Sequence, residues 1–448
     1  MTAESRPTNG SVAIVGGGFT GLTAAYRLSA AGHTVTLFEQ GDDLGGLAGG
    51  FTMGGQPLEK AYHFLYRTDE HMWGLLDELE MRDLVHFHDS SLSTYYDGVL
   101  YPMMTPLDLI RFKPLSFVDR IRAGVTVLYL QRVRKWEKLT HVTALSWLRK
   151  WAGPRVTDVV WEPLLRGKFD HYYDKVTMGW LWGRVKQRAD SQDRGENTEK
   201  LGYFTGGFRV LVDELVSRTE AAGGTVRTGA TIDSVGHDPD TGLVEINHGG
   251  TTETFDKALL TVPSTVAGRL LADYHRADPD YFAKLEAIDY LAAAVLVFMS
   301  EQQITPYYWH NINEPDSPFV VFLSLTNLVG TDDFDGRHVY YIGDYVPDEH
   351  AYMAMSPDKL KEHWYTQMGR IFPDFDRDQI VEDELFRFRD SQHIVDVGYE
   401  DKLVPHQTPC PGVWLANFSQ IYPMDRGTNY AVRDGIDLAE EISRTFSD

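Results

Sequence analysis

The chain of 448 residues has one cysteine and no apolar run long enough to cross a membrane. The single cysteine, Cys410, excludes an internal disulfide and fits a reducing compartment, so we expect a cytoplasmic protein. The longest apolar runs, residues 123–130 and 290–300, suit buried strands or helices, because a membrane span needs about 20 apolar residues. The first ten residues are polar and lack the charged-then-apolar order of a signal peptide, so export is not expected.

Two common kinds of catalytic site are also missing. No His or Cys cluster has the spacing of metal ligands, and no Gly-x-Ser-x-Gly motif occurs, so metallohydrolase and serine-hydrolase functions are excluded. Cys410 lies between Pro409 and Pro411 with no His or Asp beside it, which favours a passive loop thiol over a nucleophile.

The net charge of −23 argues against nucleic acid as a partner, because neutralising phosphates needs a basic footprint. The charge is uneven, since the segment from Leu109 to Arg188 holds 17 Lys and Arg and 6 Asp and Glu. Two interpretations stay open. This segment is either a solvated helical face or a basic region that attracts an anionic substrate or an anionic membrane surface.

The N-terminal part of the chain predicts a β-α-β unit. Residues 11–15 form a short apolar run, residues 22–31 show a helical pattern, and residues 34–38 predict a second strand. The turn between the first strand and the helix is Gly16-Gly17-Gly18-Phe19-Thr20-Gly21, which satisfies G-x-G-x-x-G. Glu39 ends the second strand, where a carboxylate accepts ribose hydroxyls and repels a 2′-phosphate. The unit therefore predicts a dinucleotide site at which an NADP-type adenosine is disfavoured.

A second glycine turn follows directly after Glu39. The segment Leu44-Gly45-Gly46-Leu47-Ala48-Gly49-Gly50 is placed where backbone could run beside a pyrophosphate and a ribityl chain, which favours FAD over NAD. No second G-x-G-x-x-G follows a strand, so a dedicated nicotinamide domain is not expected.

These motifs resemble the flavin amine-oxidase superfamily, which includes amine oxidases, protoporphyrinogen oxidases, phytoene-type desaturases and UDP-galactopyranose mutases. The extended fingerprint lies on residues 16–46, with Leu47 where many members have Arg or Lys. Residues 59–64 are similar to the stretch under the isoalloxazine ring, and residues 232–235 to the strand whose backbone reads adenine. Residues 412–417 and 422–432 are similar to the strand, loop and helix that cap the flavin, with Asn417 where most members have Asp.

The resemblance implies an α/β fold with a discontinuous Rossmann-type FAD-binding domain, an antiparallel-sheet substrate domain and a helical insertion. The expected FAD-binding parts are residues 10–105, 201–265 and 391–448, the last of which caps the flavin. The helical insertion is expected over residues 106–200 and the substrate domain over residues 266–390, within which residues 357–371 show a helical pattern.

We expect FAD contacts from both glycine turns, from the acid between them and from the segments that carry the resemblance. The expected residues are Gly16, Gly18, Phe19, Gly21, Glu39, Gly45, Gly46, Leu47, Tyr62, Ile232, Asn417, Asn429, Tyr430 and Ala431. The helix opening near Asn429 would direct its positive end at the flavin.

Three residues are candidates for the chemistry itself. His63 could steer flavin geometry or move a proton, with a packing role as the alternative. Tyr422 is placed at the flavin face or serves only as a wall. Arg188, with Arg184, could hold an anionic substrate group or form a surface salt bridge.

The expected function is that of an FAD-dependent oxidoreductase that takes a hydride from a small organic substrate onto flavin N5. The substrate could be anionic, such as a sugar nucleotide, a polyprenyl compound or a carboxylate, and peripheral membrane contact stays open. One alternative is a redox-neutral enzyme similar to UDP-galactopyranose mutase. A more remote alternative is a flavin-free prenyl or lipid carrier similar to Rab GDP-dissociation inhibitors. The oligomeric state is not predicted.

Overall fold

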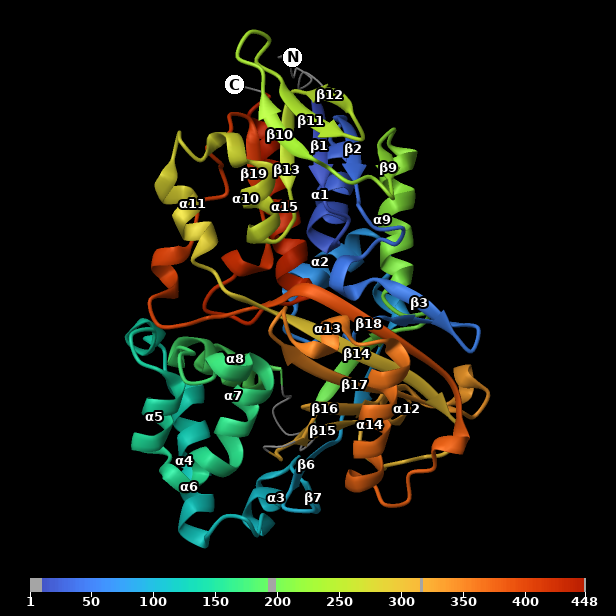
Figure 1. Ribbon diagram of the computed structural model, residues 1–448, viewed down its shortest axis with the longest axis vertical. Coiled ribbons are helices and arrows are strands. Elements are labelled where there is room, and N and C mark those ends of the chain that lie inside the picture. The colour runs from blue at the N-terminus through green and yellow to red at the C-terminus, as the bar shows by residue number, and fades with distance from the viewer. Residues whose placement is uncertain (1–9, 192–198, 315–316, 447–448) are drawn as a thin grey trace, which may run out of the picture.

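The computed structural model describes residues 10–191, 199–314 and 317–446. The molecule is elongated, with a parallel sheet and its helices at one end and a larger sheet beside a group of helices at the other (Figure 1). Among the described residues, no helix combines the length and apolarity that a bilayer crossing requires.

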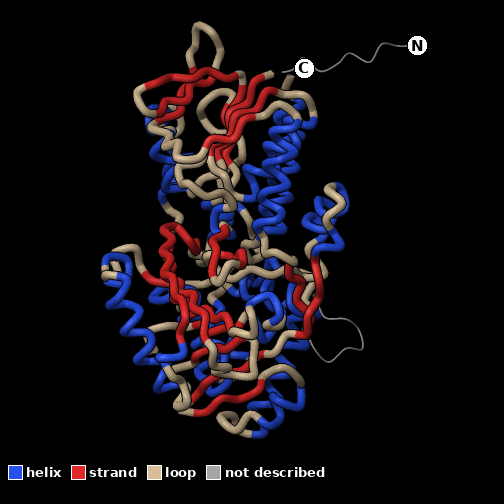
Figure 2. Tube along the Cα trace, turned by 90° about the vertical axis from the view of Figure 1, so that its right-hand side faces the viewer, coloured by secondary structure: helices blue, strands red, loops and turns tan. Residues whose placement is uncertain are grey.

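A five-stranded parallel sheet is assembled from three distant parts of the chain, in the order β19-β13-β1-β2-β9. Its strands are β1 (Ser11–Val15), β2 (Thr34–Phe38), β9 (Thr225–Arg227), β13 (Lys257–Leu260) and β19 (Val413–Leu415). Their apolar side chains, such as Val12 and Leu259, are fully buried, as expected of a parallel sheet covered on both faces. The helices α1 (Phe19–Ala30), α9 (Arg209–Ala221) and α15 (Thr428–Arg444) pack together at this sheet (Figure 2).

Smaller antiparallel sheets accompany the parallel one. Three strands form a meander, β10 (Ser234–His237), β11 (Val244–His248) and β12 (Thr251–Phe255). Two further sheets are antiparallel strand pairs: β3 (Gly50–Met53) pairs with β4 (Gln56–Glu59) close by in the chain, and β5 (Val85–Asp89) pairs with the distant β8 (Lys200–Phe204). The helix α2 (Glu70–Glu78) packs against α15.

The larger sheet has seven strands in the order β18-β14-β17-β16-β15-β6-β7. Its strands are β6 (Leu92–Tyr96), β7 (Val99–Pro102), β14 (Tyr290–Ser300), β15 (Trp309–Ile312), β16 (Val321–Ser324), β17 (His338–Val346) and β18 (Ile380–His393). All neighbours are antiparallel except the parallel pair β15 and β6. The helix α14 (Pro357–Ile371) buries Leu360, Trp364 and Met368, which repeat every four residues and join the core of this sheet.

Shorter helices lie in the connections that follow β13, β16 and β17. They are α10 (Ser264–Leu270), α11 (Pro279–Glu286), α12 (Thr326–Val329) and α13 (Ala351–Ala354).

A group of helices beside the larger sheet has its own core, which includes Leu148, Leu165 and Trp180. Its helices are α3 (Pro106–Arg111), α4 (Phe117–Arg132), α5 (Ala144–Trp151), α6 (Pro154–Val156), α7 (Glu162–Phe169) and α8 (Met178–Asp190). Hydroxyl groups fix where α4, α5 and α8 begin, because Ser116, Thr143 and Thr177 accept hydrogen bonds from the backbone of the first turn.

The mixed α/β class expected from the sequence is confirmed. The strands β1 and β2 and the helix α14 have the expected bounds, but α1 begins at Phe19 instead of Leu22, because Gly18 already caps it in an extended conformation. The strand β10 begins at Ser234, so Ile232 lies just before it. The strands β6 and β7, in the segment 10–105, pair with the larger sheet and not with the parallel sheet.

Candidate active site

The two glycine turns meet at the carboxyl end of β1. Gly45 N donates to Gly17 O over 2.8 Å, and Gly18 and Gly45 form a parallel bridge. A Cβ atom on Gly18 would meet only the Cα of Gly46, at 3.9 Å, so the space beside this glycine is open. A Cβ on Gly21 would lie 2.0 Å from Gly16 O, so this glycine is needed for packing of α1 on the strand. The open side at Gly18 and the amino end of α1 fit a pyrophosphate.

Glu39 organises the same turn. Its Oε2 accepts from Gly17 N over 2.7 Å, and its Oε1 accepts from Gly41 N over 2.8 Å. The carboxylate is therefore held at the end of β2, next to the glycine turn, where the ribose of a dinucleotide is expected.

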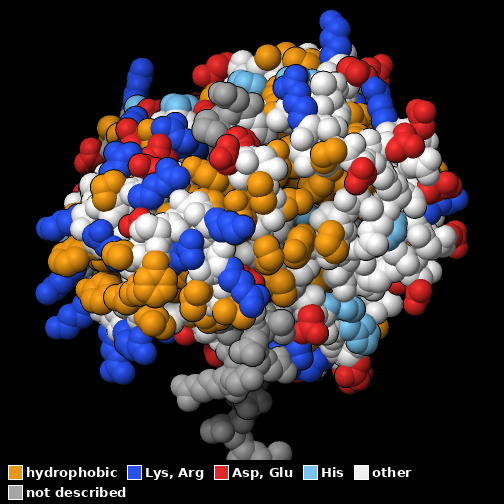
Figure 3. Space-filling view, turned by 90° about the horizontal axis from the view of Figure 1, so that it is seen from below, with side chains coloured by type: hydrophobic (Ala, Val, Ile, Leu, Met, Phe, Trp, Pro, Cys, Tyr) orange, Lys and Arg blue, Asp and Glu red, His pale blue; other side chains and the backbone are white. Residues whose placement is uncertain are grey.

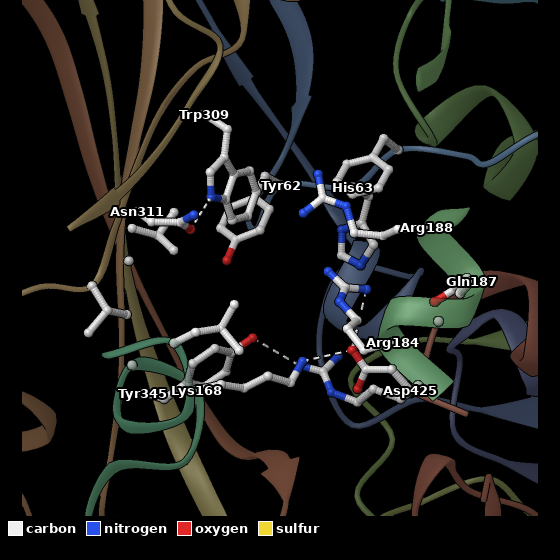
Figure 4. Close-up of a pocket in the computed structure, with 18 of the residues that line it drawn as sticks. Tyr62, His63, Lys168, Arg184, Gln187, Arg188, Trp309, Asn311, Tyr345 and Asp425 are labelled. Atoms are coloured by element: carbon white, nitrogen blue, oxygen red, sulfur yellow. Dashed lines mark hydrogen bonds and ion pairs between the residues drawn. The ribbon is translucent and has the colours of Figure 1, made fainter. Parts of the chain in front are cut away.

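A cavity of about 470 Å³ lies between the larger sheet, α8 and the loop that precedes α15. Leu47, Tyr62, His63, Asn429 and Tyr430 line it, so several of the expected cofactor residues reach this space. Figure 4 shows Tyr62, Trp309 and Asn311 on one side, facing Arg184 and Arg188 on the other. Tyr62 packs edge-on against Trp309 at 5.0 Å and Tyr341 at 6.3 Å, which makes this wall rigid and aromatic.

Four cationic side chains line the cavity: Lys168, Arg184, Arg188 and Arg426. Lys168 Nζ lies 2.9 Å and Arg184 Nη1 3.5 Å from Asp425 Oδ2, and Asp425 is almost fully buried. Arg188 holds Glu199 through Nε at 3.1 Å and Nη2 at 2.8 Å. Arg426 donates to the neutral groups of Gln392 and Tyr345.

The acidic residues of the lining do not neutralise these cations. Burial raises the pKa of Asp344 well above its usual value and that of Asp69 to about 7. Burial also opposes ionisation of Asp425 and Glu199, but Lys168 and Arg188 respectively outweigh it and lower their pKa values. Three of the four cations pair with only two carboxylates, those of Asp425 and Glu199, and Arg426 contacts neutral groups. Since burial favours the neutral form of Asp344 and Asp69, the lining has more cations than paired carboxylates and an excess of positive charge.

His63 is a neutral imidazole in this cavity. Burial lowers its pKa to about 4, against the opposing effect of a hydrogen bond to the backbone of Ala61. Because Ala61 O can only accept, the 2.7 Å contact assigns the proton to Nδ1 and leaves Nε2 as an acceptor.

Other predicted residues lie away from the cavity lining. Asn417 donates to Val262 O over 3.0 Å and accepts from Ser419 N over 3.0 Å, so its amide is engaged within the protein. Tyr422 packs against Trp136 at 5.9 Å and Tyr399 at 5.6 Å, on the side of the helices.

The remaining predicted residues have packing or positional contacts. Ile232 is buried in the core around the parallel sheet, and Phe19 packs on Phe208 at 6.2 Å. Ala431 lies in the first turn of α15, and Asn429 Oδ1 accepts from Met72 N over 3.0 Å.

Several residues of the cavity were not predicted. Trp309 and Asn311 alternate on β15, and Gly343 and Tyr345 alternate on β17, so a period of two in these strands could have indicated a shared face. Asp425 and Arg426 lie in the C-terminal segment 422–432, which carries part of the family resemblance. No signal in the sequence singled out Lys168.

Comparisons with known proteins agree with this architecture. The family model described as flavin containing amine oxidoreductase matches residues 19–443. Coproporphyrinogen III oxidase of Mycobacterium tuberculosis is 46% identical over 233 residues, which are 47% of this chain and 51% of that protein. The chain spans between half and two thirds of the length of the curated coproporphyrinogen III oxidases it matches.

Solved structures show the same fold. A proposed protoporphyrinogen oxidase from Exiguobacterium has a TM-score of 0.76 at 18% identity, covering 98% of this chain and 99% of that chain. Reduced UDP-galactopyranose mutase has a TM-score of 0.74 at 15% identity, covering 97% and 95%.

The family match covers nearly the whole chain, and the open glycine turn with Glu39 beside it fits the cofactor of that family. The alternative of a flavin-free carrier is therefore wrong. The chain belongs to the flavin-containing amine oxidoreductase family and is an FAD-dependent oxidoreductase.

Proposed function

We propose that this enzyme oxidises an anionic organic substrate with an apolar body, bound between the aromatic wall at Tyr62 and Trp309 and the cations of α8. The observation that carries the proposal is the excess of positive charge in a cavity of about 470 Å³. A buried charge is costly unless it is paired, so an anionic group of the substrate would stabilise this lining. FAD, when bound, supplies the chemistry by accepting the two electrons of the oxidation as a hydride at N5.

The arginines of α8 position the substrate. Arg184 and Arg188 are four residues apart and so lie on one face of the helix, which lines the cavity. Glu199 engages Nε and Nη2 of Arg188, and the guanidinium retains further N–H donors for a carboxylate or phosphate.

The neutral imidazole of His63 can accept a hydrogen bond from the substrate. Its Nε2 accepts a hydrogen bond from a substrate N–H or O–H, and the bond from Nδ1 to Ala61 O fixes the tautomer and the ring orientation. With a pKa of about 4, His63 stays in this acceptor form across the neutral range.

A porphyrinogen that carries carboxylates is the first substrate to test. The relative that is 46% identical over 233 residues is named coproporphyrinogen III oxidase, and the carboxylates of its substrate are groups that an arginine pair recognises. The apolar remainder of such a molecule matches the aromatic wall.

The experiment mixes the FAD-loaded enzyme with coproporphyrinogen III without oxygen and follows flavin absorbance. Bleaching of the oxidised flavin is expected. Arg184→Ala and Arg188→Ala should each raise KM by about 10- to 100-fold with a smaller effect on kcat, because a charge-assisted contact to a remote group contributes about equally to ground and transition states. In Arg184→Ala the carboxylate of Asp425 keeps its ion pair with Lys168, so this variant leaves no unpaired acid.

Lys186→Ala is the matched control. Lys186 lies between the two arginines on α8, pairs with Asp190 at 2.6 Å and is not among the residues that line the cavity. Its loss should leave KM unchanged. Turnover of UDP-galactopyranose without net change in flavin oxidation state would replace the proposal by the mutase alternative, and a neutral substrate unaffected by either arginine variant would overturn it.

A further inference from the structure

The outer side of the helical group exposes an unusual number of large apolar side chains. Ten of the fourteen that are exposed among the described residues lie between Leu107 and Trp151. Six of them belong to α4, with exposed fractions of 49 to 65%: Phe117, Val118, Ile121, Val125, Leu128 and Tyr129. We call this set, together with Leu107 and Ile110 of α3 and Trp151 of α5, the outer apolar face.

Helical geometry places the six side chains of α4 together. At 3.6 residues per turn they fall within an arc of roughly 120°. The opposite side of α4 carries Ala123, Thr126 and Leu130, which are buried against the neighbouring helices. The helix α4 is thus apolar on both sides, although only the inner side is covered by the protein.

Cations that form no ion pair within the described part of the chain surround the outer apolar face. Arg111, Lys113, Arg132, Arg134 and Lys135 are exposed, and none of them forms an ion pair with the described residues. The acidic residues between Leu107 and Lys135 are Asp108 and Asp119, and both bind hydroxyl groups at helix starts. Seen from below, apolar side chains gather among Lys and Arg at the side where these helices lie (Figure 3).

We propose that the outer apolar face docks onto an anionic lipid membrane. The cations match the charge of the lipid headgroups, and the apolar side chains would insert at the boundary between headgroups and acyl chains. Nucleic acid would use the cations but leave the apolar side chains in water. Because the chain carries a net charge of −23, an anionic bilayer repels the rest of the molecule, so this face also fixes the orientation of binding.

Aromatic residues at the edge of the face support a lipid partner. Tyr129 stacks with Trp147 at 6.1 Å, and Trp147 lies 6.2 Å from the exposed Trp151. Tyr and Trp are enriched where protein meets the headgroup layer, because one end of each side chain is apolar and the other polar.

The same helix reaches the cavity from the other side. Val127 and Gln131 of α4 line the cavity, while Val125 and Leu128 point into solvent. Docking through α4 would therefore bring the cavity within about one helix diameter, ~10 Å, of the bilayer.

The test is co-sedimentation of the FAD-loaded protein with vesicles of phosphatidylcholine containing about one third phosphatidylglycerol, compared with pure phosphatidylcholine. We expect binding to the anionic vesicles that weakens with added salt. Phe117→Ser/Ile121→Ser/Val125→Ser should lower the partition coefficient by on the order of 100-fold. Arg132→Gln/Arg134→Gln/Lys135→Gln should lower it by about fivefold for each cation removed.

Matched variants elsewhere on the surface give the controls. Leu84→Ser/Val381→Ser removes exposed apolar groups, and Arg276→Gln/Lys284→Gln/Lys359→Gln removes exposed cations, all outside the outer apolar face. Neither should change vesicle binding, and flavin content and thermal unfolding confirm that each variant folds. Absence of vesicle binding, or equal binding by the apolar triple variant, would overturn the proposal. So would a dimer in sedimentation velocity that this variant converts to monomer, since a second copy would then cover the face.

Discussion

Replacing Gly18 by alanine separates cofactor binding from folding. The new Cβ would meet only the Cα of Gly46, at 3.9 Å, which is an ordinary van der Waals contact. Gly18 has φ −76° and ψ 177°, a conformation that alanine adopts without strain. The apo protein should therefore keep its free energy of unfolding or gain about 0.4 to 1 kcal/mol, because alanine restricts the unfolded chain.

FAD binding should suffer, because the second glycine of this turn is where backbone approaches the pyrophosphate. Loss of two charge-assisted hydrogen bonds, at about 1.5 kcal/mol each, weakens binding by about 3 kcal/mol, or more than ~100-fold in Kd. Gly18→Val, with a larger side chain, should abolish binding. The assays are fluorescence titration of the apo protein with FAD and chemical denaturation without FAD.

Alanine substitutions at two other glycines serve as controls. Gly21→Ala places a Cβ 2.0 Å from Gly16 O and 2.9 Å from Thr261 Oγ1, so it should destabilise even the apo protein, by at least about 2 kcal/mol. Gly268→Ala on α10 meets nothing within 4 Å and should leave Kd unchanged. A Kd for Gly18→Ala within threefold of the parent would show that the cofactor does not approach this turn and would refute the reasoning.

Two further predictions concern single carboxylates. Glu39→Ala should raise the Kd for FAD by about 10- to 150-fold, since a charge-assisted bond contributes about 1.5 to 3 kcal/mol, and an unchanged Kd by fluorescence titration would place Glu39 outside the binding site. Burial raises the pKa of Asp69 to about 7, so between about pH 5 and 7 the folded protein keeps a proton that the unfolded chain has released. The free energy of unfolding should fall as pH rises through this window, by up to about 1.4 kcal/mol per unit, and Asp69→Asn should make the profile from urea denaturation less steep; parallel profiles would contradict this. Burial also raises the pKa of Glu59 to about 7. Because Glu59 is unchanged in Asp69→Asn, the free energy of unfolding of this variant still falls with pH, though less steeply.

Short sequence patterns correctly predicted those strands and helices that depend only on residues close together in the chain. The strands β1 and β2 and the helix α14 follow from apolar runs, glycine turns and helical periodicity, each contained in a short stretch of sequence. The pairing of β6 with β15 joins residues more than 200 positions apart, and the apolar pattern of a short strand does not specify its partner.

In the candidate site, too, the features set by a short stretch of sequence were predictable, and those that join distant segments were not. Glu39 and the glycine turns were predictable, because their roles depend on a single β-α-β unit. The cation cluster depends on α7, α8 and the loop before α15 meeting at one point, so the role of Lys168 next to Asp425 appears only in three dimensions. The expected roles of Asn417 and Tyr422 at the flavin stay predictions, and the hydrogen bonds of Asn417 and the ring contacts of Tyr422 give both residues structural contacts in addition.

The basic segment from Leu109 to Arg188 divides into two surfaces, for which we propose different partners. Lys168, Arg184 and Arg188 point into the cavity, whereas Arg132 and Lys135 border the outer apolar face. The two partners that the sequence left open for a basic region, an anionic substrate and an anionic membrane surface, therefore concern different residues and can be tested independently. Arg184→Ala should change KM and leave vesicle binding intact, because Arg184 lines the cavity and is not part of the outer apolar face. Arg132→Gln/Arg134→Gln/Lys135→Gln should weaken vesicle binding and leave KM for a substrate supplied in water unchanged. If either variant changed both measurements by similar factors, the two surfaces would be one continuous site, and the substrate would be reached from the membrane side through α4.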